Sequence, residues 1–242
     1  MGALTIRIEP LRTPFIAFAH RGAAIHETAD SAAAYGLAVR LGATGIETDL
    51  WITADGHPIL AATGSVRRGL RRHHIRDRSR EELGEAVADL DDLANAVGPH
   101  AHVLLTVRDS AAVSTAVQRL GDREGGGGRL WLGSSDLGQL ESWRVDLPDV
   151  GLVHSTRLAA LSGGPEWHAA ALSRAGINAV RMPYADWTGG LTTLFHRFEV
   201  ECFGWDAPHA RMIKDLLRAG CDAISTVRID RLSEALGGDP PA

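Results

Sequence analysis

The sequence predicts an α/β protein with the (β/α)8 architecture, a TIM barrel, formed as a single domain by residues 1–242. Short apolar segments alternate along the chain with helical stretches of about ten to fifteen residues, which is the pattern of parallel βα units. The chain has 242 residues, of which 45% are hydrophobic and 23% charged. A barrel of eight βα units typically needs about 250 residues, so length and pattern agree.

The predicted strands are short runs rich in Val, Ile, Leu and Phe. They cover residues 15–20, 45–52, 102–107, 129–135, 150–155, 178–184, 199–205 and 223–227. Helices are expected between them, around residues 32–41, 91–97, 111–120, 138–145, 166–175, 191–198, 210–219 and 230–236. The connection at 55–89 is too long for a plain loop, so it is expected to form a small excursion over the barrel mouth. The glycines at 125–128 are expected to form a flexible turn before the fourth strand.

Two polar motifs end the first two predicted strands. His20 can exchange a proton near neutral pH, and Arg21 carries a permanent charge on a planar group that suits phosphate. Glu47 and Asp49 alternate along the second strand, so both carboxylates project from the same face, as in a site for a hard cation. The first motif alone is more often structural than catalytic. Together the two motifs indicate phosphoester chemistry.

Barrel enzymes place their chemistry at the C-terminal ends of the strands. Many polar residues of this chain map to that end: His20, Arg21, Glu47, Asp49, Arg108, Asp109, Ser134, Ser135, Asp136, His154, Arg181, Tyr184, Trp205, Asp206 and Thr226. His102 maps to the opposite end, where a structural role is expected. Arg71, Arg72, His73 and His74 lie in the excursion, where they either contact an anion or are solvated.

These motifs resemble those of the glycerophosphodiester phosphodiesterase family. The matching elements are His20-Arg21-Gly22, Glu47-Thr48-Asp49 and the turn Thr53-Ala54-Asp55-Gly56, and residues 65–77, 194–198 and 203–208 are similar to a bacterial branch of the family. The resemblance implies a barrel that hydrolyses phosphoric diesters and releases glycerol 3-phosphate. It also implies a pair of histidines for proton transfer and a calcium or magnesium ion held by three acidic side chains.

Several positions depart from the family pattern. Ala62-Thr63 stand where relatives carry a His-Asp pair, and Thr106 stands where they carry the third acidic metal ligand. Further departures are Arg108 in place of a lysine, Ala29-Asp30 in place of a Glu-Asn pair (with Glu27 close by), Pro183-Tyr184 in place of histidines, and Thr226-Val227 in place of an acidic strand end. His57 and His154 are the candidates to replace the missing histidine.

The resemblance therefore implies a degenerate site. His20 and Arg21 are predicted to be catalytic, and Glu47 and Asp49 to be an incomplete metal site that binds a divalent cation weakly or not at all. Arg21, Arg108, Arg181, Trp205 and Asp206 are predicted to bind substrate. We expect Glu47 and Asp49 to pair with Arg21 and Arg108 in place of a metal.

Three functions stay open at this point. The first is a phosphodiesterase with a rearranged site, and the second is a non-catalytic barrel that binds a small phosphorylated or anionic molecule. The third is a metal-free barrel enzyme that uses His20 and Asp206.

The composition disfavours several other classes of function and indicates a location. A net charge of −5 and a pI of about 6.1 give no general attraction to nucleic acid. Lys214 is the sole lysine and lies in a predicted helix, which disfavours Schiff-base chemistry. Cys202 and Cys221 are expected to be buried apolar residues. The sequence shows neither a secretory leader nor an 18-residue apolar span, so a cytoplasmic location is expected, whereas the oligomeric state stays open.

Overall fold

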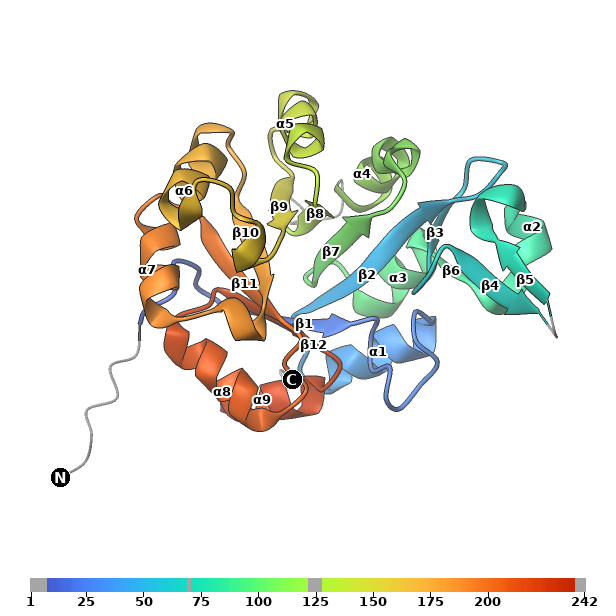
Figure 1. Ribbon diagram of the computed structural model, residues 1–242. Coiled ribbons are helices and arrows are strands. Elements are labelled where there is room, and N and C mark those ends of the chain that lie inside the picture. Colours follow the sequence, from blue (N-terminus) through green and yellow to red (C-terminus); the bar gives the residue numbers. More distant parts are fainter. Residues whose placement is uncertain (1–7, 69–70, 122–127, 238–242) are drawn as a thin grey trace.

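Eight parallel strands close into a barrel (Figure 1). The computed structural model describes residues 8–68, 71–121 and 128–237. The barrel strands are β1 (Ile16–His20), β2 (Gly45–Ile52), β7 (His102–Val107), β8 (Leu130–Ser134), β9 (Gly151–Ser155), β10 (Ala179–Pro183), β11 (Glu201–Trp205) and β12 (Ala223–Thr226). Each pairs with the next along the chain, and β1 also pairs with β12, which closes the barrel. The predicted fold is confirmed, with strand ends within two residues of those expected. The turn predicted at 125–128 lies outside the described residues except for Gly128.

Helices join successive strands and surround the barrel. They are α1 (Ala32–Arg40), α3 (Leu90–Val97), α4 (Val113–Gly121), α5 (Leu137–Asp146), α6 (Gly164–Arg174), α7 (Gly189–His196), α8 (Ala210–Ala219) and α9 (Ile229–Leu236). Side chains fix several helix starts: Ser31, Asp136 and Thr188 each accept a backbone N–H of the first turn. The predicted start of α4 at residue 111 is too early, because Ser110–Ala112 form a separate 3-10 turn.

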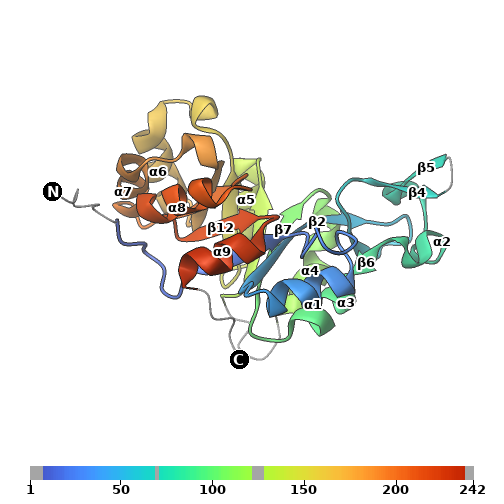
Figure 2. The same ribbon diagram turned by 90° about the horizontal axis from the view of Figure 1, so that it is seen from below.

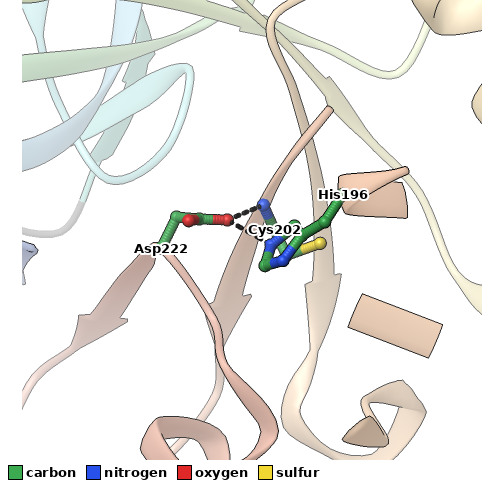
Figure 3. A group of neighbouring side chains, drawn as sticks. All are labelled: His196, Cys202 and Asp222. Carbon is green, nitrogen blue, oxygen red and sulfur yellow. Dashed lines mark hydrogen bonds and ion pairs between the residues drawn. The ribbon is translucent and has the colours of Figure 1, made fainter. Parts of the chain in front are cut away.

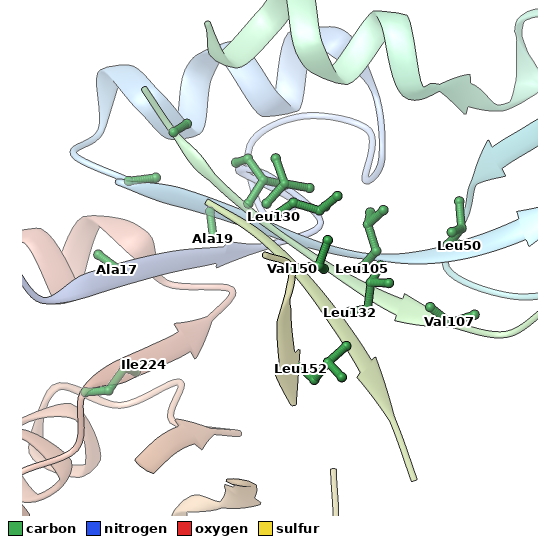
Figure 4. Packing of buried hydrophobic residues seen from close by; sticks show 14 of the residues in the cluster. Ala17, Ala19, Leu50, Leu105, Val107, Leu130, Leu132, Val150, Leu152 and Ile224 are labelled. Atoms are coloured by element: carbon green, nitrogen blue, oxygen red, sulfur yellow. The ribbon is translucent and has the colours of Figure 1, made fainter. Parts of the chain in front are cut away.

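Two apolar layers hold the barrel together. The residues that face its interior near the N-terminal ends of the strands are Ile16, Phe18, Leu104, Trp131, Val153, Ala179, Phe203 and Ala223. The outward-facing residues between them, such as Ala17, Leu105, Leu132, Leu152 and Ile224, pack against the helices (Figure 4). The inner layer fills the lower barrel, so the inward-facing polar residues of the same strands lie above it, toward the mouth.

Strand register decides which polar residues share the interior. Paired residues of neighbouring parallel strands point to the same side of the sheet. His20 pairs with Glu47, and Asp49 pairs with Thr106. Ser155 pairs with Arg181 on the opposite part of the barrel. These side chains therefore converge above the apolar layer.

The connection after β2 forms a small lobe. It contains β3 (Pro58–Leu60), β4 (Ser65–Arg68), β5 (Arg71–His74), η1 (Ile75–Asp77), α2 (Arg80–Leu83), η2 (Gly84–Ala86) and β6 (Ala88–Asp89). β3 pairs with the far end of β2, β6 pairs with β3, and Ile59, Ile75 and Leu83 belong to a separate apolar cluster. Both views show the lobe projecting from the side of β2 (Figures 1 and 2). None of its described residues lines the cavity at the C-terminal ends of the barrel strands.

In the described part of the chain, no helix has both the length and the apolar character needed to cross a membrane.

Candidate functional site

A cavity of about 430 Å³ opens at the C-terminal ends of the barrel strands. The predicted site residues all line it: His20, Arg21, Glu47, Asp49, Thr106, Arg108, Arg181, Trp205 and Asp206. The structure thus brings together residues from β1, β2, β7, β10 and β11, and their chemical roles stay predictions. Ser155 and Ser225 also line the cavity, and the sequence analysis did not select either of them.

Glu47 is the most deeply buried charge of the site, with 2% of its surface exposed. The Arg181 guanidinium pairs with Oε1, and the Ser225 hydroxyl donates a hydrogen bond to Oε2. Burial alone raises the pKa of Glu47, but Arg181, His20 and Ser225 outweigh burial and lower the pKa to about 2. Glu47 is therefore a carboxylate throughout the physiological pH range.

Glu47 also orients His20. The His20 Nδ1 atom lies 3.3 Å from Oε2 of Glu47. A ring nitrogen held by a carboxylate fixes the orientation of the imidazole and leaves Nε2 as the nitrogen available for proton transfer. His20 thus has the geometry of a general acid or base at the cavity.

Asp49 holds the other two arginines of the cavity. Arg21 Nη2 lies 3.0 Å from Asp49 Oδ2, and Arg108 Nε lies 2.7 Å from Oδ1. Arg21 Nη2 also donates to the carbonyl of Ala62 at 3.2 Å. The expected pairing is thus only partly correct: Asp49 takes both Arg21 and Arg108, whereas Glu47 pairs with Arg181, which faces it from β10.

A buried aspartate supports Arg21 from behind. Asp30 Oδ1 accepts hydrogen bonds from Thr48 Oγ1 at 2.6 Å and from the Tyr35 hydroxyl at 3.3 Å, and Oδ2 lies 4.0 Å from Arg21 Nε. Burial raises the pKa of Asp30, although the Thr48 hydrogen bond opposes this. Arg21 and Asp30 both have left-handed backbone, with φ of 61° and 56°. The sequence showed Asp30 only as a departure from the family pattern and gave no sign of this contact.

The carboxylates do not fit a divalent cation. All four oxygens of Glu47 and Asp49 already face guanidinium, imidazole or hydroxyl groups. Within the residues that the structure describes, no third carboxylate, thiol or imidazole comes close enough to both to complete a group of three ligands. Calcium and magnesium require several oxygen ligands, and nearby guanidinium groups repel them. In this site Arg21, Arg108 and Arg181 provide the positive charge that balances the two carboxylates.

The two candidate replacement histidines lie outside the cavity. His154 is buried on the outer side of β9, with Nδ1 3.0 Å from His168 Nε2 and Nε2 3.3 Å from the Ser135 carbonyl. Burial lowers the pKa values of both His154 and His168, the latter to about 4. His57 lies on an exposed turn, 3.4 Å from Asp55. Neither can serve His20 as a proton-transfer partner in this arrangement.

Other polar residues at the strand ends have local roles. Asp109 and Asp136 accept backbone N–H groups where η3 (Ser110–Ala112) and α5 begin, and Tyr184 donates to Asp215. At the opposite end of the barrel, His102 Nδ1 accepts a hydrogen bond from the Trp131 indole. The structural role predicted for His102 is therefore confirmed.

A second polar group lies at that opposite end, formed by His196, Cys202 and Asp222 (Figure 3). Asp222 accepts the Cys202 amide at 2.6 Å and the Arg12 amide at 2.9 Å, and lies 2.9 Å from His196 Nε2. Burial raises the pKa of the Cys202 thiol well above its ordinary value. The Asp222 carboxylate thus anchors the segment around Arg12 through the Arg12 amide. As predicted, both cysteines are free and buried.

Comparison with known protein families matches the part of the chain that contains several of the cavity residues. The sequence model of the "Glycerophosphoryl diester phosphodiesterase family" matches residues 20–117, which include His20, Arg21, Glu47, Asp49 and Thr106. No curated protein matches the chain. The family resemblance predicted from the sequence is confirmed by this match and by the fold, whereas the bacterial branch is not.

Solved structures share the whole barrel. A glycerophosphodiester phosphodiesterase from Thermotoga maritima is 17% identical with a TM-score of 0.79, covering 92% of this chain and 99% of that one. A putative glycerophosphoryl diester phosphodiesterase from Silicibacter pomeroyi is 18% identical with a TM-score of 0.77, covering 96% and 95%. An Oleispira antarctica phosphodiesterase, solved with its product sn-glycerol-3-phosphate, is 14% identical with a TM-score of 0.80, covering 91% and 96%. At these identities the similarity establishes the fold.

Proposed function

We propose that this chain binds a glycerophosphodiester or glycerol 3-phosphate without a divalent ion. The chain matches the glycerophosphoryl diester phosphodiesterase family over residues 20–117 and has the fold of solved structures of that name. In this proposal the catalytic site is degenerate. One observation carries it: Arg21, Arg108 and Arg181 engage both carboxylates that the family uses as metal ligands.

The arginines supply a positively charged surface for the phosphate. The Arg108 side chain is 50% exposed and that of Arg21 is 28% exposed, so both present N–H groups to the cavity while Asp49 holds them. A guanidinium donates two parallel hydrogen bonds to a phosphate. Arg181 is only 10% exposed and contributes mainly by neutralising Glu47. The site is thus preorganised for an anion.

Proton transfer rests on His20 alone among the described histidines of the cavity. The loss of one acid or base group typically costs a factor of about 10² to 10⁴ in rate. Asp206 offers a second candidate function, because its exposed carboxylate lines the same cavity on left-handed backbone with φ of 60°. A metal-free reaction that uses His20 and Asp206 would show as turnover that a chelator leaves unchanged.

The proposed ligand places the protein in glycerophospholipid breakdown or in the sensing of its products. The cytoplasm remains the predicted compartment.

Replacement of Arg21 by Ala is expected to weaken glycerol 3-phosphate binding by about 1.5 to 3 kcal/mol, because a hydrogen bond to a charged group is lost. Isothermal titration calorimetry measures the effect. The matched control is Arg174→Ala, which removes an exposed arginine at the C-terminal end of α6, the opposite end of the barrel from the cavity. Unchanged affinity in Arg21→Ala would place the anion elsewhere, for example at Arg71 and Arg72.

Millimolar calcium or magnesium is expected to leave the melting temperature within about one degree of that in EDTA. A cation present at 100 times its Kd stabilises the native state by about 2.7 kcal/mol, which in a chain of this size raises Tm by roughly 5 to 10 °C. Differential scanning fluorimetry distinguishes the two cases. A rise of that size that Asp49→Asn abolishes would show that a cation displaces the arginines.

A further inference from the structure

A second hollow continues from the main cavity toward the end of β9. Its volume is about 400 Å³, and it shares Ser135, Ser155, Arg181 and Trp205 with the main cavity. Its additional walls come from the segment after β9, which includes Arg157. None of the described residues that line it is acidic. A ligand bound at the arginines of the main cavity can therefore extend into this hollow.

Arg157 differs from the other arginines of the site. Arg21, Arg108 and Arg181 each pair with a carboxylate. In the part of the chain that the structure describes, no carboxylate lies within ion-pair distance of Arg157. Its guanidinium lies over the Trp205 ring, 5.9 Å from the ring centre. Stacking on an aromatic ring orients a guanidinium and leaves its N–H groups free for an anion.

The backbone around Arg157 is fixed at both sides. The Thr156 amide donates to the Arg181 carbonyl at 2.9 Å, and the Leu158 amide donates to Asp186 Oδ2 at 2.8 Å. The segment is thus tied to β10 and to the turn after it. Arg157 projects from a supported loop, so little ordering is required when a ligand binds.

The boundary between the two hollows carries an unused hydroxyl. Ser155 faces the interior in register with Arg181, and its Oγ atom is buried without a hydrogen-bond partner. A buried hydroxyl without a partner is unfavourable because it has given up its hydrogen bonds to water. A ligand oxygen at this point would satisfy it.

We propose that the hollow around Arg157 binds the alcohol half of the ligand and selects an alcohol that carries a negative charge. This rests on the proposed function, because it requires the diester phosphate to lie at Arg21 and Arg108. The selected ligand is then a glycerophosphodiester with a second anionic group that can pair with the stacked Arg157 in a hollow whose described lining holds no carboxylate.

The test compares four soluble probes by calorimetry: glycerol 3-phosphate, glycerophosphocholine, glycerophosphoinositol and glycerophosphoinositol 4-phosphate. The three diesters carry a cationic, an uncharged and an anionic alcohol. We expect the anionic diester to bind most tightly to the wild type. Arg157→Gln should weaken it about fivefold, the effect of an ion pair worth about 1 kcal/mol at a partly exposed position, and this difference should shrink at high salt. Arg157→Gln should leave glycerol 3-phosphate unchanged, and the control Arg174→Gln should change neither.

The outcomes separate the two proposals. If glycerol 3-phosphate binds but Arg157→Gln affects no diester, or the choline diester binds most tightly, the assignment of the hollow is wrong and the proposed function stands. If no probe binds to the folded wild type, both are wrong. An equal loss for all four probes in Arg157→Gln would place Arg157 in the phosphate site, which also overturns the assignment.

Discussion

A Glu47→Gln variant should lose about 3 to 5 kcal/mol of unfolding free energy, the range found when one partner of a buried ion pair is removed. Glu47 is 2% exposed and neutralises Arg181, whose side chain is 10% exposed, while it also accepts the Ser225 hydroxyl and holds His20. Glutamine keeps the volume but leaves the Arg181 charge without its partner. Urea denaturation followed by circular dichroism measures the loss.

Two further variants make this prediction specific. Asp206→Asn removes an exposed carboxylate of the same cavity, so its stability should stay within about 0.5 kcal/mol of the wild type. The double variant Glu47→Gln/Arg181→Met removes both charges and should regain part of the loss, because the penalty comes from the unpaired charge. A loss below about 1 kcal/mol in Glu47→Gln would mean that water reaches this pair.

The same ion pair predicts a pH dependence. The pKa of Glu47 is about 2 in the folded protein, against an ordinary value of 4.5. A carboxyl with a lowered pKa in the folded state stabilises the fold fully above the ordinary value, and this contribution disappears as the pH falls through the folded value. The wild type should therefore lose stability between about pH 4.5 and pH 2, by about 3 kcal/mol from this group. Glu47→Gln should show a flatter profile over that range.

The second large effect is a gain of activity in a repaired variant. Ala62→His, Thr63→Asp and Thr106→Glu together would supply the second proton-transfer group and the third acidic ligand that the family resemblance implies, and Ala29→Glu would supply a supporting carboxylate. Thr106 pairs with Asp49 in the sheet, so a glutamate there adds a third carboxylate beside the first two. Arg21 donates a hydrogen bond to the residue 62 carbonyl, so position 62 lies beside the arginine that we propose binds the phosphate. We expect hydrolysis of glycerophosphocholine with calcium or magnesium to exceed that of the wild type by about 10² to 10⁴-fold.

The contacts of Arg21, Arg108 and Arg181 with Asp49 and Glu47 suggest controls for the repaired variant. Each half of the repair alone should do little, since groups that act as a unit are strongly non-additive. Arg108→Lys, added to the full repair, should increase cation dependence, because it frees an Asp49 oxygen. Chelator-sensitive turnover by the wild type that is lost on His20→Ala would contradict the degenerate site. Since His57 and His154 lie outside the cavity, Asp206 would then be the next residue to test.

The fold and the location of the site follow from local patterns, whereas the pairing of charges does not. Glu47 and Asp49 alternate on one strand, so their common face can be read from the sequence. Their partners depend on which side chains meet across the closed barrel, and Arg181 lies 134 positions further along the chain than Glu47. No local pattern encodes that contact.

The orientation of His154 is a second feature that the sequence could not predict. The strand that contains it is buried on both faces, as is usual in parallel sheets, so apolar residues do not reveal which alternate positions point inward. The register places Val153 and Ser155 inside and His154 outside. The position of the lobe after β2 could not be predicted from the sequence either. It depends on the pairing of the last residues of β2 with β3.

The position of Glu47 also bears on how the polypeptide folds. The matched family segment ends at residue 117, and Glu47 lies within it, yet Arg181 and Ser225 belong to the other half of the chain, with Ser225 178 residues away from Glu47. A fragment ending near residue 117 would keep His20 beside this carboxylate but would lack the Arg181 guanidinium and the Ser225 hydroxyl. These contacts of Glu47 therefore require the last strands to close the barrel, so the completed site depends on contacts between residues far apart in the sequence.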